Sequence, residues 1–234
     1  MIHSFLLIGQ SNMAGLGKIE DAIPVDKTHI KILRNGRWQR MFRPINPDRS
    51  FAGVNLAESF AEAYAAKHGV DVGLICCADG NTSLELWQEG GVLYDNAVGQ
   101  AKLAARSSTL MGVLWHQGEA DCPAELAATY CPRFEKIMHA FRRDLGLEDK
   151  PFILGELGEF LSECVLSETL KNYPVVNEHL HRVAAQNPHT GIVSSKGLTA
   201  NSDNLHFNSA SLYEFGLRYF AEYERVRNQE GSAE

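Results

Sequence analysis

Short apolar runs alternate along the chain with longer stretches in which apolar residues recur at helical spacing. The runs are short enough for strands of a sheet that is buried on both faces, where every position is apolar. Strands that alternate with helices favour βαβ crossovers and therefore a parallel sheet with helices on both sides. The expected strands are residues 2–8, 72–77, 110–115, 152–156 and 190–194, and the expected helices are residues 55–67, 94–106, 123–144, 168–186 and 209–225.

A small hairpin interrupts this alternation. Asn35-Gly36 is a favoured dipeptide for a two-residue turn, and it lies between the strand-like residues 30–33 and 37–41. The polar residues 227–234 are expected to fray. The pattern contains neither an internal repeat nor a linker, so we predict a single α/β domain over residues 1–234, with a parallel sheet of about five strands.

Charge and cysteine content exclude several classes of protein. Lys and Arg total 22 against 29 Asp and Glu, so the net charge of -7 gives no basic surface for nucleic acid or an anionic membrane. The early apolar run, residues 5–8, is too short to cross a bilayer and lacks the flanks of a signal peptide, which predicts a cytoplasmic protein. Five cysteines without a C-x-x-C spacing argue against disulfides and structural zinc, and Cys76 and Cys77 are expected to be buried thiols.

Polar segments follow four of the expected elements. In an open parallel sheet, ligands bind beyond the carboxyl ends of the strands, so these segments are candidates for a site. Ser11 is either part of such a site or a helix N-cap. Asp203 and His206 lie three residues apart, so in a helical turn the carboxylate can fix the tautomer of the imidazole. The segments are Gly9-Gln10-Ser11-Asn12-Met13-Ala14-Gly15, Ala78-Asp79-Gly80-Asn81-Thr82-Ser83, Trp115-His116-Gln117-Gly118-Glu119-Ala120-Asp121 and Ser202-Asp203-Asn204-Leu205-His206-Phe207-Asn208.

Four ordered blocks carry a family resemblance. GQSNM at the first strand, CA-x-G-x-TS-x-x-x-W from Cys77 to Trp87, HQGE-x-D from His116 to Asp121 and D-x-L-HF from Asp203 to Phe207 resemble the blocks of the SGNH hydrolases. More narrowly, they are similar to the sialate O-acetylesterase and acetylxylan esterase-like branch, the carbohydrate esterase family 6 type. The resemblance implies a flavodoxin-like three-layer α/β/α fold, a serine esterase without cofactor or metal, and acetylated sugars or oligosaccharides as substrates.

The resemblance and the chemistry of ester cleavage assign the same roles. An ester hydrolase needs an activated nucleophile, a base with its orienting group, and donors for the oxyanion. Ser11 is expected to attack, His206 to take its proton and Asp203 to orient His206. The oxyanion is expected to bind the backbone N–H groups of Ser11 and Gly80 and the amide of Gln117. The residues expected to bind substrate or support the site are Gln10, Asn12, Asn81, Trp87, His116 and Glu119.

The second block departs from the family at two positions. The family commonly has two glycines there, whereas here the second is Asn81, and an unusual Asp79 precedes Gly80. An oxyanion loop depends on backbone N–H groups more than on side chains. We therefore expect Gly80 to keep its role and Asn81 to alter the rim of the site, with consequences for substrate preference.

Several polar or aromatic residues have a second interpretation. Trp87 either packs in the core or stacks on a sugar. Glu119 and Asp121 are two residues apart and diverge on a strand or a helix, so support of the Ser11 loop is expected rather than a glycosidase pair. His179 and His181 also diverge on a helix, and we expect them on a solvated face rather than at a metal.

Two other functions stay open beside the carbohydrate O-acetylesterase. One is a catalytically silent carbohydrate-binding protein, which would have lost Ser11, Asp203 or His206, and all three are present. The other is a short-chain lipase or thioesterase of the same superfamily. That function favours a long apolar groove, and no exposed apolar segment indicates one. The sugar, its acetylated position and homo-oligomer formation are not specified by the sequence.

Overall fold

In the computed structural model, which describes residues 1–229, seven strands form one sheet in the order β3-β2-β4-β1-β5-β6-β7. All neighbouring strands are parallel except β2 and β3, which form an antiparallel pair. The five predicted strands are confirmed and occupy the centre and one side of the sheet. The strands are β1 (Ile2–Gly9), β2 (Ile30–Arg34), β3 (Arg37–Arg40), β4 (Asp71–Cys76), β5 (Ser108–His116), β6 (Phe152–Gly155) and β7 (Thr190–Val193).

The hairpin extends the sheet instead of interrupting the alternation. β2 pairs in parallel with β4, with Ile30 opposite Val72 and Ile32 opposite Leu74. Ile30 and Ile32 are fully buried because their side chains point to the same face of the sheet and pack beneath its helices. The prediction of about five strands is therefore corrected to seven, since the hairpin contributes two strands at one edge.

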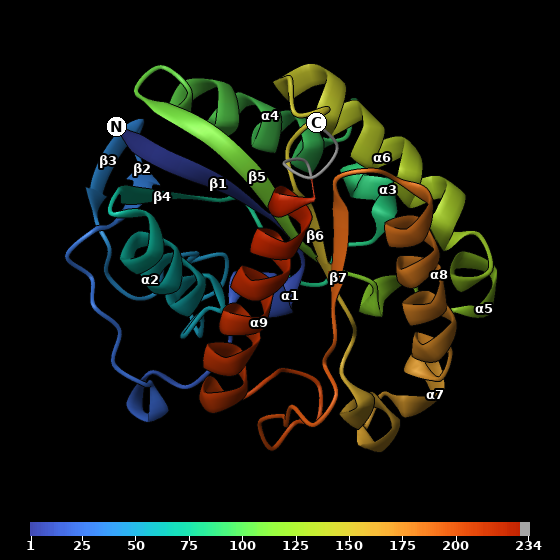
Figure 1. Cartoon of the computed structure of the whole chain (residues 1–234). Helices are drawn as coiled ribbons and strands as arrows, with labels where there is room; N and C mark the ends of the chain where they lie inside the picture. Colours follow the sequence, from blue (N-terminus) through green and yellow to red (C-terminus); the bar gives the residue numbers. More distant parts are fainter. Residues whose placement is uncertain (230–234) are drawn as a thin grey trace.

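Helices cover both faces of the sheet, which confirms the three-layer α/β/α arrangement. Phe5 and Leu7 of β1 point to a core formed with α2 and α9, while Leu6 and Ile8 point to a core formed with α4, α6 and α8. Figure 1 shows α2 and α9 on the near side of the sheet and α4 and α6 behind it. The longer helices are α2 (Ala57–His68), α4 (Val92–Ala104), α6 (Tyr130–Leu145), α8 (Tyr173–Gln186) and α9 (Ser209–Asn228).

Two of the predicted helices are each divided into a short and a long helix. The predicted helix 123–144 is divided into α5 (Ala124–Ala127) and α6, and the predicted helix 168–186 into α7 (Ser167–Leu170) and α8. Pro132 and Pro174 lie in the first turns of α6 and α8. A proline has no N–H to donate and its ring clashes with the carbonyl four residues before it, so neither helix extends further towards the N-terminus.

The end of the chain and the cysteines also test predictions. α9 continues to Asn228, so Arg227 and Asn228 are helical rather than frayed, and residues 230–234 lie outside the described residues. The cysteines are free thiols. Cys77 is buried and Cys76 is partly buried, and burial raises the pKa of Cys77 to about 12, so its thiol stays protonated. Within residues 1–229, no helix is both long and apolar enough to span a membrane.

Candidate active site

The end of β1 fixes the position of Ser11. Gly9 has a φ of +133°, and a Cβ added to it would lie 2.0 Å from the carbonyl oxygen of His116, so only glycine allows β1 to end this close to β5. The backbone N–H of Gln10 then donates to that same carbonyl at 2.9 Å. Ser11 is the first residue of the short helix α1 (Ser11–Ala14). The nucleophile candidate is thereby held at the carboxyl edge of the sheet.

Ser11, His206 and Asp203 form a continuous chain of hydrogen bonds. The distance from Ser11 Oγ to His206 Nε2 is 3.0 Å, and the distance from His206 Nδ1 to Asp203 Oδ2 is 2.7 Å. A hydroxyl in this arrangement can pass its proton to the imidazole while it attacks a carbonyl carbon. Asp203 and His206 lie 192 and 195 positions after Ser11 in the sequence. The structure brings the three residues together because β1 and the segment before α9 end at the same edge of the sheet.

Asp203 is held by a turn and not by a helix. Its Oδ1 accepts the backbone N–H groups of Leu205 and His206, at 2.9 and 3.1 Å, and residues 202–206 form a turn before α9. The expectation of a helical turn is therefore corrected. Partial burial alone raises the pKa of Asp203, but the hydrogen bonds from Leu205 and His206 outweigh it and hold that pKa below the ordinary value. Asp203 is therefore ionised at neutral pH, which favours the His206 tautomer with its proton on Nδ1.

Asn12 and Gln10 support the hydrogen-bonded residues Ser11, His206 and Asp203 from inside the protein. Asn12 Nδ2 donates to Glu119 Oε1 at 2.7 Å, and Asn12 Oδ1 accepts the backbone N–H of Phe207 at 3.1 Å. Asn12 thus ties α1 to the segment that carries His206. Gln10 Oε1 accepts the backbone N–H of Gly118 at 3.3 Å. Both side chains are buried, so they have a supporting position and limited access to substrate.

Gln117 lies in a different place from the one expected of an oxyanion donor. Its side chain is fully buried, and its Nε2 donates to the carbonyl of Thr82 at 3.0 Å and to Asp121 Oδ2 at 2.6 Å. Its Oε1 accepts the hydroxyl of Tyr130 at 3.0 Å. Both amide hydrogens are used inside the protein, so the predicted oxyanion role of Gln117 does not fit the geometry.

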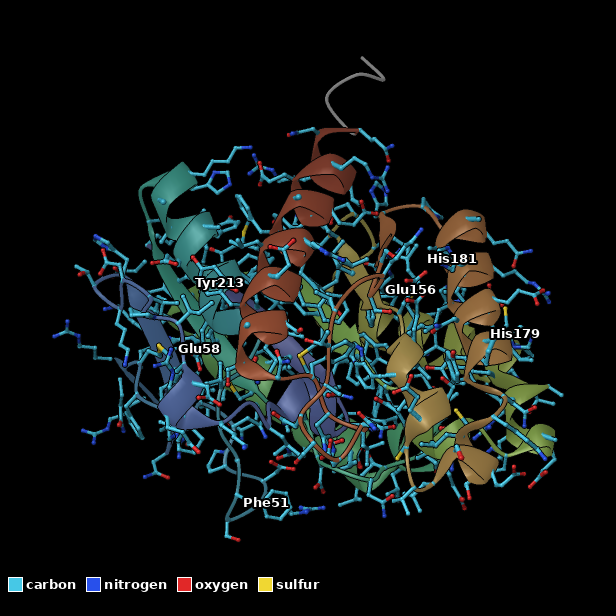
Figure 2. All side chains as sticks on the ribbon, turned by 90° about the horizontal axis from the view of Figure 1, so that it is seen from below. Phe51, Glu58, Glu156, His179, His181 and Tyr213 are labelled. Atoms are coloured by element: carbon cyan, nitrogen blue, oxygen red, sulfur yellow. The ribbon has the colours of Figure 1, made fainter. Side chains whose placement is uncertain are left out.

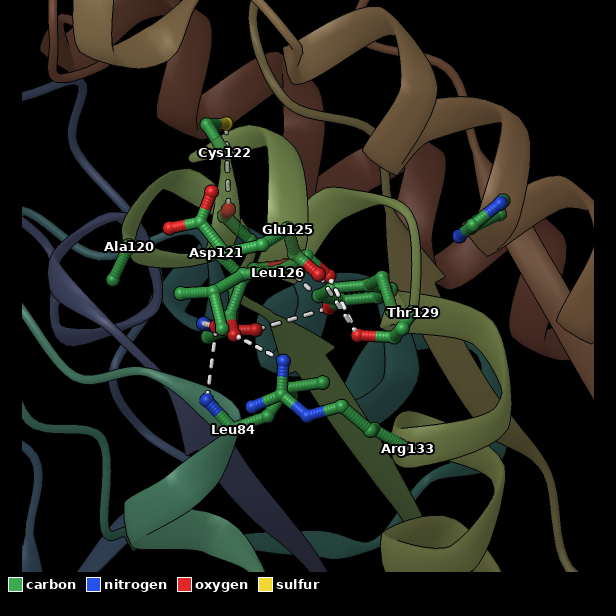
Figure 3. A network of polar contacts seen from close by, with 12 residues as sticks. Leu84, Ala120, Asp121, Cys122, Glu125, Leu126, Thr129 and Arg133 are labelled. Carbon is green, nitrogen blue, oxygen red and sulfur yellow. Dashed lines mark hydrogen bonds and ion pairs between the residues drawn. The ribbon is translucent and has the colours of Figure 1, made fainter.

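Asp121 is the centre of the network that Gln117 joins. Its carboxylate also accepts the backbone N–H of Leu84 at 2.9 Å and Arg133 Nη1 at 3.0 Å, as Figure 3 shows. Glu119 points instead to Asn12. The two carboxylates therefore serve different parts of the loop, which agrees with the expectation that they are not a glycosidase pair.

Gln117→Ala is expected to lower the melting temperature while the folded fraction keeps its turnover. The substitution removes the donor to the buried carbonyl of Thr82 and one of the three donors to Asp121, at a cost of about 1–3 kcal/mol. Gln117→Glu is expected to be more destabilising, because its carboxylate would face that of Asp121. The measurement is a thermal melt together with turnover per folded molecule, with the exposed Gln88→Ala as control. A stably folded Gln117→Ala protein whose turnover falls about 10²–10³-fold would restore the oxyanion role.

The loop after β4 brings Gly80 next to Ser11, but its N–H already has an acceptor. Gly80 N donates to Asp48 Oδ2 at 3.0 Å, and Arg49 Nη2 donates to the carbonyl of Gly80 at 2.8 Å. Arg49 Nη1 also pairs with Asp79 at 2.8 Å. The unusual Asp79 thus fixes Arg49 at the rim. Asn81 adopts a φ of +61°, a conformation that asparagine tolerates better than most residues, which explains how it replaces glycine.

Asp48 and Arg49 belong to the site, although no sequence motif indicated them. They lie between the hairpin and α2, in a segment without periodicity or a catalytic motif. Their place beside Gly80 depends on how that segment folds back across the sheet edge. Burial raises the pKa of Asp48 from its ordinary value, although the N–H of Gly80 and the charge of Arg49 oppose the shift.

Trp87 and His116 belong to the framework of the site. Trp87 is fully buried, its Nε1 donates to Thr82 Oγ1 at 3.1 Å, and its ring meets that of Trp115 edge to face at 5.6 Å. Of its two interpretations, core packing is correct. His116 is also fully buried, and the distance from its Nε2 to the carbonyl oxygen of Glu156 is 3.1 Å. Burial lowers the pKa of His116. It is therefore a neutral packing residue.

His179 and His181 point in different directions on α8, as Figure 2 shows. His181 is exposed and lies 2.6 Å from Glu156, in agreement with a solvated face but beside a carboxylate that the sequence did not indicate. His179 is buried and accepts the backbone N–H of Cys131 at 3.2 Å, so the prediction of a solvated face is wrong for it. It joins α8 to α6 because it faces the core between them. Over residues 1–229, no three His, Cys, Asp or Glu side chains form a group able to hold a metal ion.

A cavity of about 410 Å³ lies directly beside Ser11 and His206. It includes predicted site residues such as Gly80, Asn81 and Glu119, and it excludes Gln117, Trp87 and His116. Its lining residues are Gln10, Ser11, Leu16, Arg49, Phe51, Gly80, Asn81, Glu119, Ala120, Leu166, Thr169, Leu170, Leu205 and His206.

The family match defines the class of the protein as a carboxylic ester hydrolase, and the α/β fold agrees with it. Residues 1–225 match the family described as carbohydrate esterase, sialic acid-specific acetylesterase, and the chain belongs to that family. A probable carbohydrate esterase of Arabidopsis thaliana is 26% identical over 242 residues, which are 91% of this chain and 86% of the relative. The protein is accordingly a hydrolase of the acetylesterase type.

Solved structures agree with the fold. An X-ray structure of an Arabidopsis thaliana protein superposes with a TM-score of 0.84 at 26% identity, over 95% of this chain and 98% of that chain. The structure of NanS has a TM-score of 0.76 at 17% identity, over 97% and 98% of the two chains. A carbohydrate acetylesterase from Xanthomonas citri has a TM-score of 0.73 at 18% identity and aligns with 97% of this chain and 56% of its own.

Proposed function

We propose that this protein is a serine esterase that removes O-acetyl groups from carbohydrates through an acetyl-enzyme intermediate. The observation that carries the proposal is the hydrogen-bonded chain from Ser11 Oγ through His206 to Asp203, beside an open cavity. The silent carbohydrate-binding alternative is disfavoured, because all three residues are present and within hydrogen-bond distance of one another. The membership of the acetylesterase family supports acetyl as the acyl group.

The proposed reaction has two halves. In the first, Ser11 Oγ forms a bond to the acetyl carbon while His206 Nε2 takes its proton, and the same proton then passes to the sugar oxygen as the carbon–oxygen bond breaks. In the second, water attacks the acetyl carbon and gives a proton to His206 Nε2. That proton then passes to Ser11 Oγ as the bond between Ser11 Oγ and the acetyl carbon breaks, and acetate leaves. Asp203 stays ionised throughout and stabilises the imidazolium that forms in each half.

The proposed oxyanion donors are the backbone N–H groups of Ser11 and Gly80. Among the described contacts, the N–H of Ser11 has no acceptor, so it is free for a substrate oxygen. The N–H of Gly80 donates to Asp48 in this structure. To bind the oxyanion, it has to break that hydrogen bond and donate to the substrate oxygen instead. Hydrogen bonds to a charged group contribute about 1.5–3 kcal/mol, so this exchange opposes catalysis.

Asp48→Ala is expected to raise turnover about tenfold, because Gly80 N–H no longer has to leave a carboxylate. The measurement is the turnover number on a soluble acetyl ester at neutral pH. Asp79→Ala is the matched control, since Asp79 contacts Arg49 in the same cluster and does not accept the N–H of Gly80. Lower turnover in a stably folded Asp48→Ala protein would instead mean that Asp48 holds the Gly80 loop in its working position.

The experiment that tests the proposed function is a substrate panel. Acetate release is measured from acetylated xylo-oligosaccharides, acetylated sialic acid and acetylated monosaccharides, with the Ser11→Ala protein beside each. Release from at least one acetylated sugar that depends on Ser11 supports the proposal. Hydrolysis of nitrophenyl acetate together with no release from any sugar ester would remove carbohydrates as the substrate and leave the esterase activity in place.

A further inference from the structure

Large apolar side chains from four separate parts of the chain contribute to the lining of the active-site cavity. We name this surface the apolar wall, and it consists of Leu16, Phe51, Leu166, Leu170 and Leu205. Leu16 follows α1, Phe51 lies in the segment before α2, Leu166 and Leu170 flank and end α7, and Leu205 lies next to His206. The wall therefore faces the same space as the candidate nucleophile.

Two members of the apolar wall are exposed to a degree that packing does not explain. Phe51 is 67% exposed and Leu166 is 50% exposed. In Figure 2, Phe51 projects from its loop at the edge of the molecule. Large apolar side chains gathered at a concave surface typically mark a site for an apolar ligand.

Several polar groups of the cavity are engaged by the protein itself. Arg49 binds Asp79 and the carbonyl of Gly80, and Glu119 Oε1 accepts Asn12. Gln10 Oε1 accepts backbone N–H groups. A polyhydroxylated ring needs free donors and acceptors on the protein, because each hydroxyl that loses water without a partner opposes binding. The engaged groups of Arg49, Glu119 and Gln10 are therefore less available to sugar hydroxyls.

We infer that the apolar wall binds an apolar carbon group attached to the scissile ester, on either its acyl or its alcohol side. The substrate class is then an ester with an alkyl or aryl substituent beside the acyl carbon or the ester oxygen, in addition to the simple acetyl esters of the family. This inference rests on the proposed function, since it places the group relative to Ser11. It also revises the expectation that no apolar groove is present.

The expected change in kcat/KM follows from the area of substrate hydrocarbon that is removed from water on binding. Burial of one methylene group corresponds to about a fourfold change in an equilibrium or rate constant when the group is fully buried. Because Phe51 and Leu166 are themselves partly exposed, a substrate group lying on them keeps some contact with water. The expected gain in kcat/KM is therefore about twofold to fourfold for each added methylene.

The experiment uses the whole chain and two series of esters. In the first, nitrophenyl acetate, butyrate, hexanoate and octanoate vary the acyl chain at a constant alcohol. In the second, methyl, butyl, hexyl and phenyl acetate vary the alcohol at a constant acyl group. Phe51→Ala, Leu166→Ala and the conservative Phe51→Leu are compared with two controls at exposed apolar residues outside the cavity, Phe42→Ala and Leu86→Ala.

A rise of kcat/KM along one series supports the inference and identifies the side of the ester that meets the wall. Phe51→Ala and Leu166→Ala should flatten that rise, Phe51→Leu should retain most of it, and the two controls should leave it unchanged. A fall of kcat/KM from the shortest ester in both series, or a rise that survives in Phe51→Ala and Leu166→Ala, overturns the inference. If kcat/KM does not change along either series but acetate release still depends on Ser11, the inference is overturned and the proposed function stands. Turnover that survives in Ser11→Ala overturns the proposed function itself.

Discussion

Ser11→Ala is expected to reduce acetyl ester hydrolysis by about 10⁶-fold while the protein stays folded. The substitution removes the atom that would form the acyl-enzyme, so no smaller loss is compatible with the proposed mechanism. Ser11 lies at the rim of the cavity, and its Oγ bonds only to His206 among the described contacts. Loss of that one partly buried bond costs about 1 kcal/mol of folding free energy, which shifts the melting temperature by a few degrees at most.

Turnover per active site and a melting curve measure this result. Ser162→Ala is the matched control, because Ser162 is an exposed serine whose Oγ also makes one hydrogen bond, to the carbonyl of Glu159. A serine-directed phosphonate should label Ser11 in the unmodified protein. Label on another serine, or turnover close to the unmodified level in folded Ser11→Ala, would show that the nucleophile lies elsewhere.

Asp203→Asn is expected to lower turnover about 10⁴-fold with little change in fold. The amide does not stabilise the imidazolium of His206, and it can donate to Nδ1, which would place the imidazole proton on Nε2 and direct it at Ser11. Because the pKa of Asp203 is lowered, its carboxylate contributes stability that is present above the ordinary carboxyl pKa of 3.8 and lost as the pH falls through the lowered value. The variant should therefore be slightly less stable than the unmodified protein at neutral pH, and the difference should vanish in acid.

The measurements are turnover against pH and melting temperature against pH. Asp149→Asn is the control, since Asp149 is also an exposed carboxylate with a lowered pKa, and it pairs with Lys150 outside the cavity. A kcat for Asp203→Asn within tenfold of the unmodified protein would mean that His206 is oriented by another group. An equal loss of turnover in Asp149→Asn would indicate a general electrostatic effect instead.

The division of two predicted helices could have been read from prolines in the sequence, but the prediction followed the helical spacing of apolar residues instead. Apolar residues keep helical spacing across residues 123–144 and 168–186, and that pattern predicted two unbroken helices. Pro132 and Pro174 were sufficient to divide these helices. A proline has no N–H to donate and its ring clashes with the carbonyl four residues before it, whatever the pattern of apolar residues around it. The second division bears on the cavity, since Leu166 directly precedes the short helix α7 and Leu170 ends it, and both line the cavity.

Gln117 shows a different case, in which the motif located the segment but the buried amide does not fit the predicted oxyanion role. The block HQGE-x-D identified the segment and placed it at the carboxyl end of β5. Whether the amide faces the cavity or the interior depends on Thr82, Tyr130 and Asp121, which come from other parts of the chain or the next turn. A residue type and its position after a strand do not specify which of two neighbouring spaces its side chain enters.

The sequence by itself determined the central strands and the edge of the sheet at which the site lies. Apolar runs buried on both faces have a local signature, and parallel strands must bring their carboxyl ends together, so Ser11 and His206 were predicted to meet. Only the tertiary structure decided that the hairpin joins the sheet, that Asp48 accepts the N–H of Gly80, and that Phe51 and Leu166 line the cavity. These features are contacts between segments far apart in the chain, and most of them involve irregular loops. Their free energy depends on how the segments pack against one another, which local periodicity does not specify.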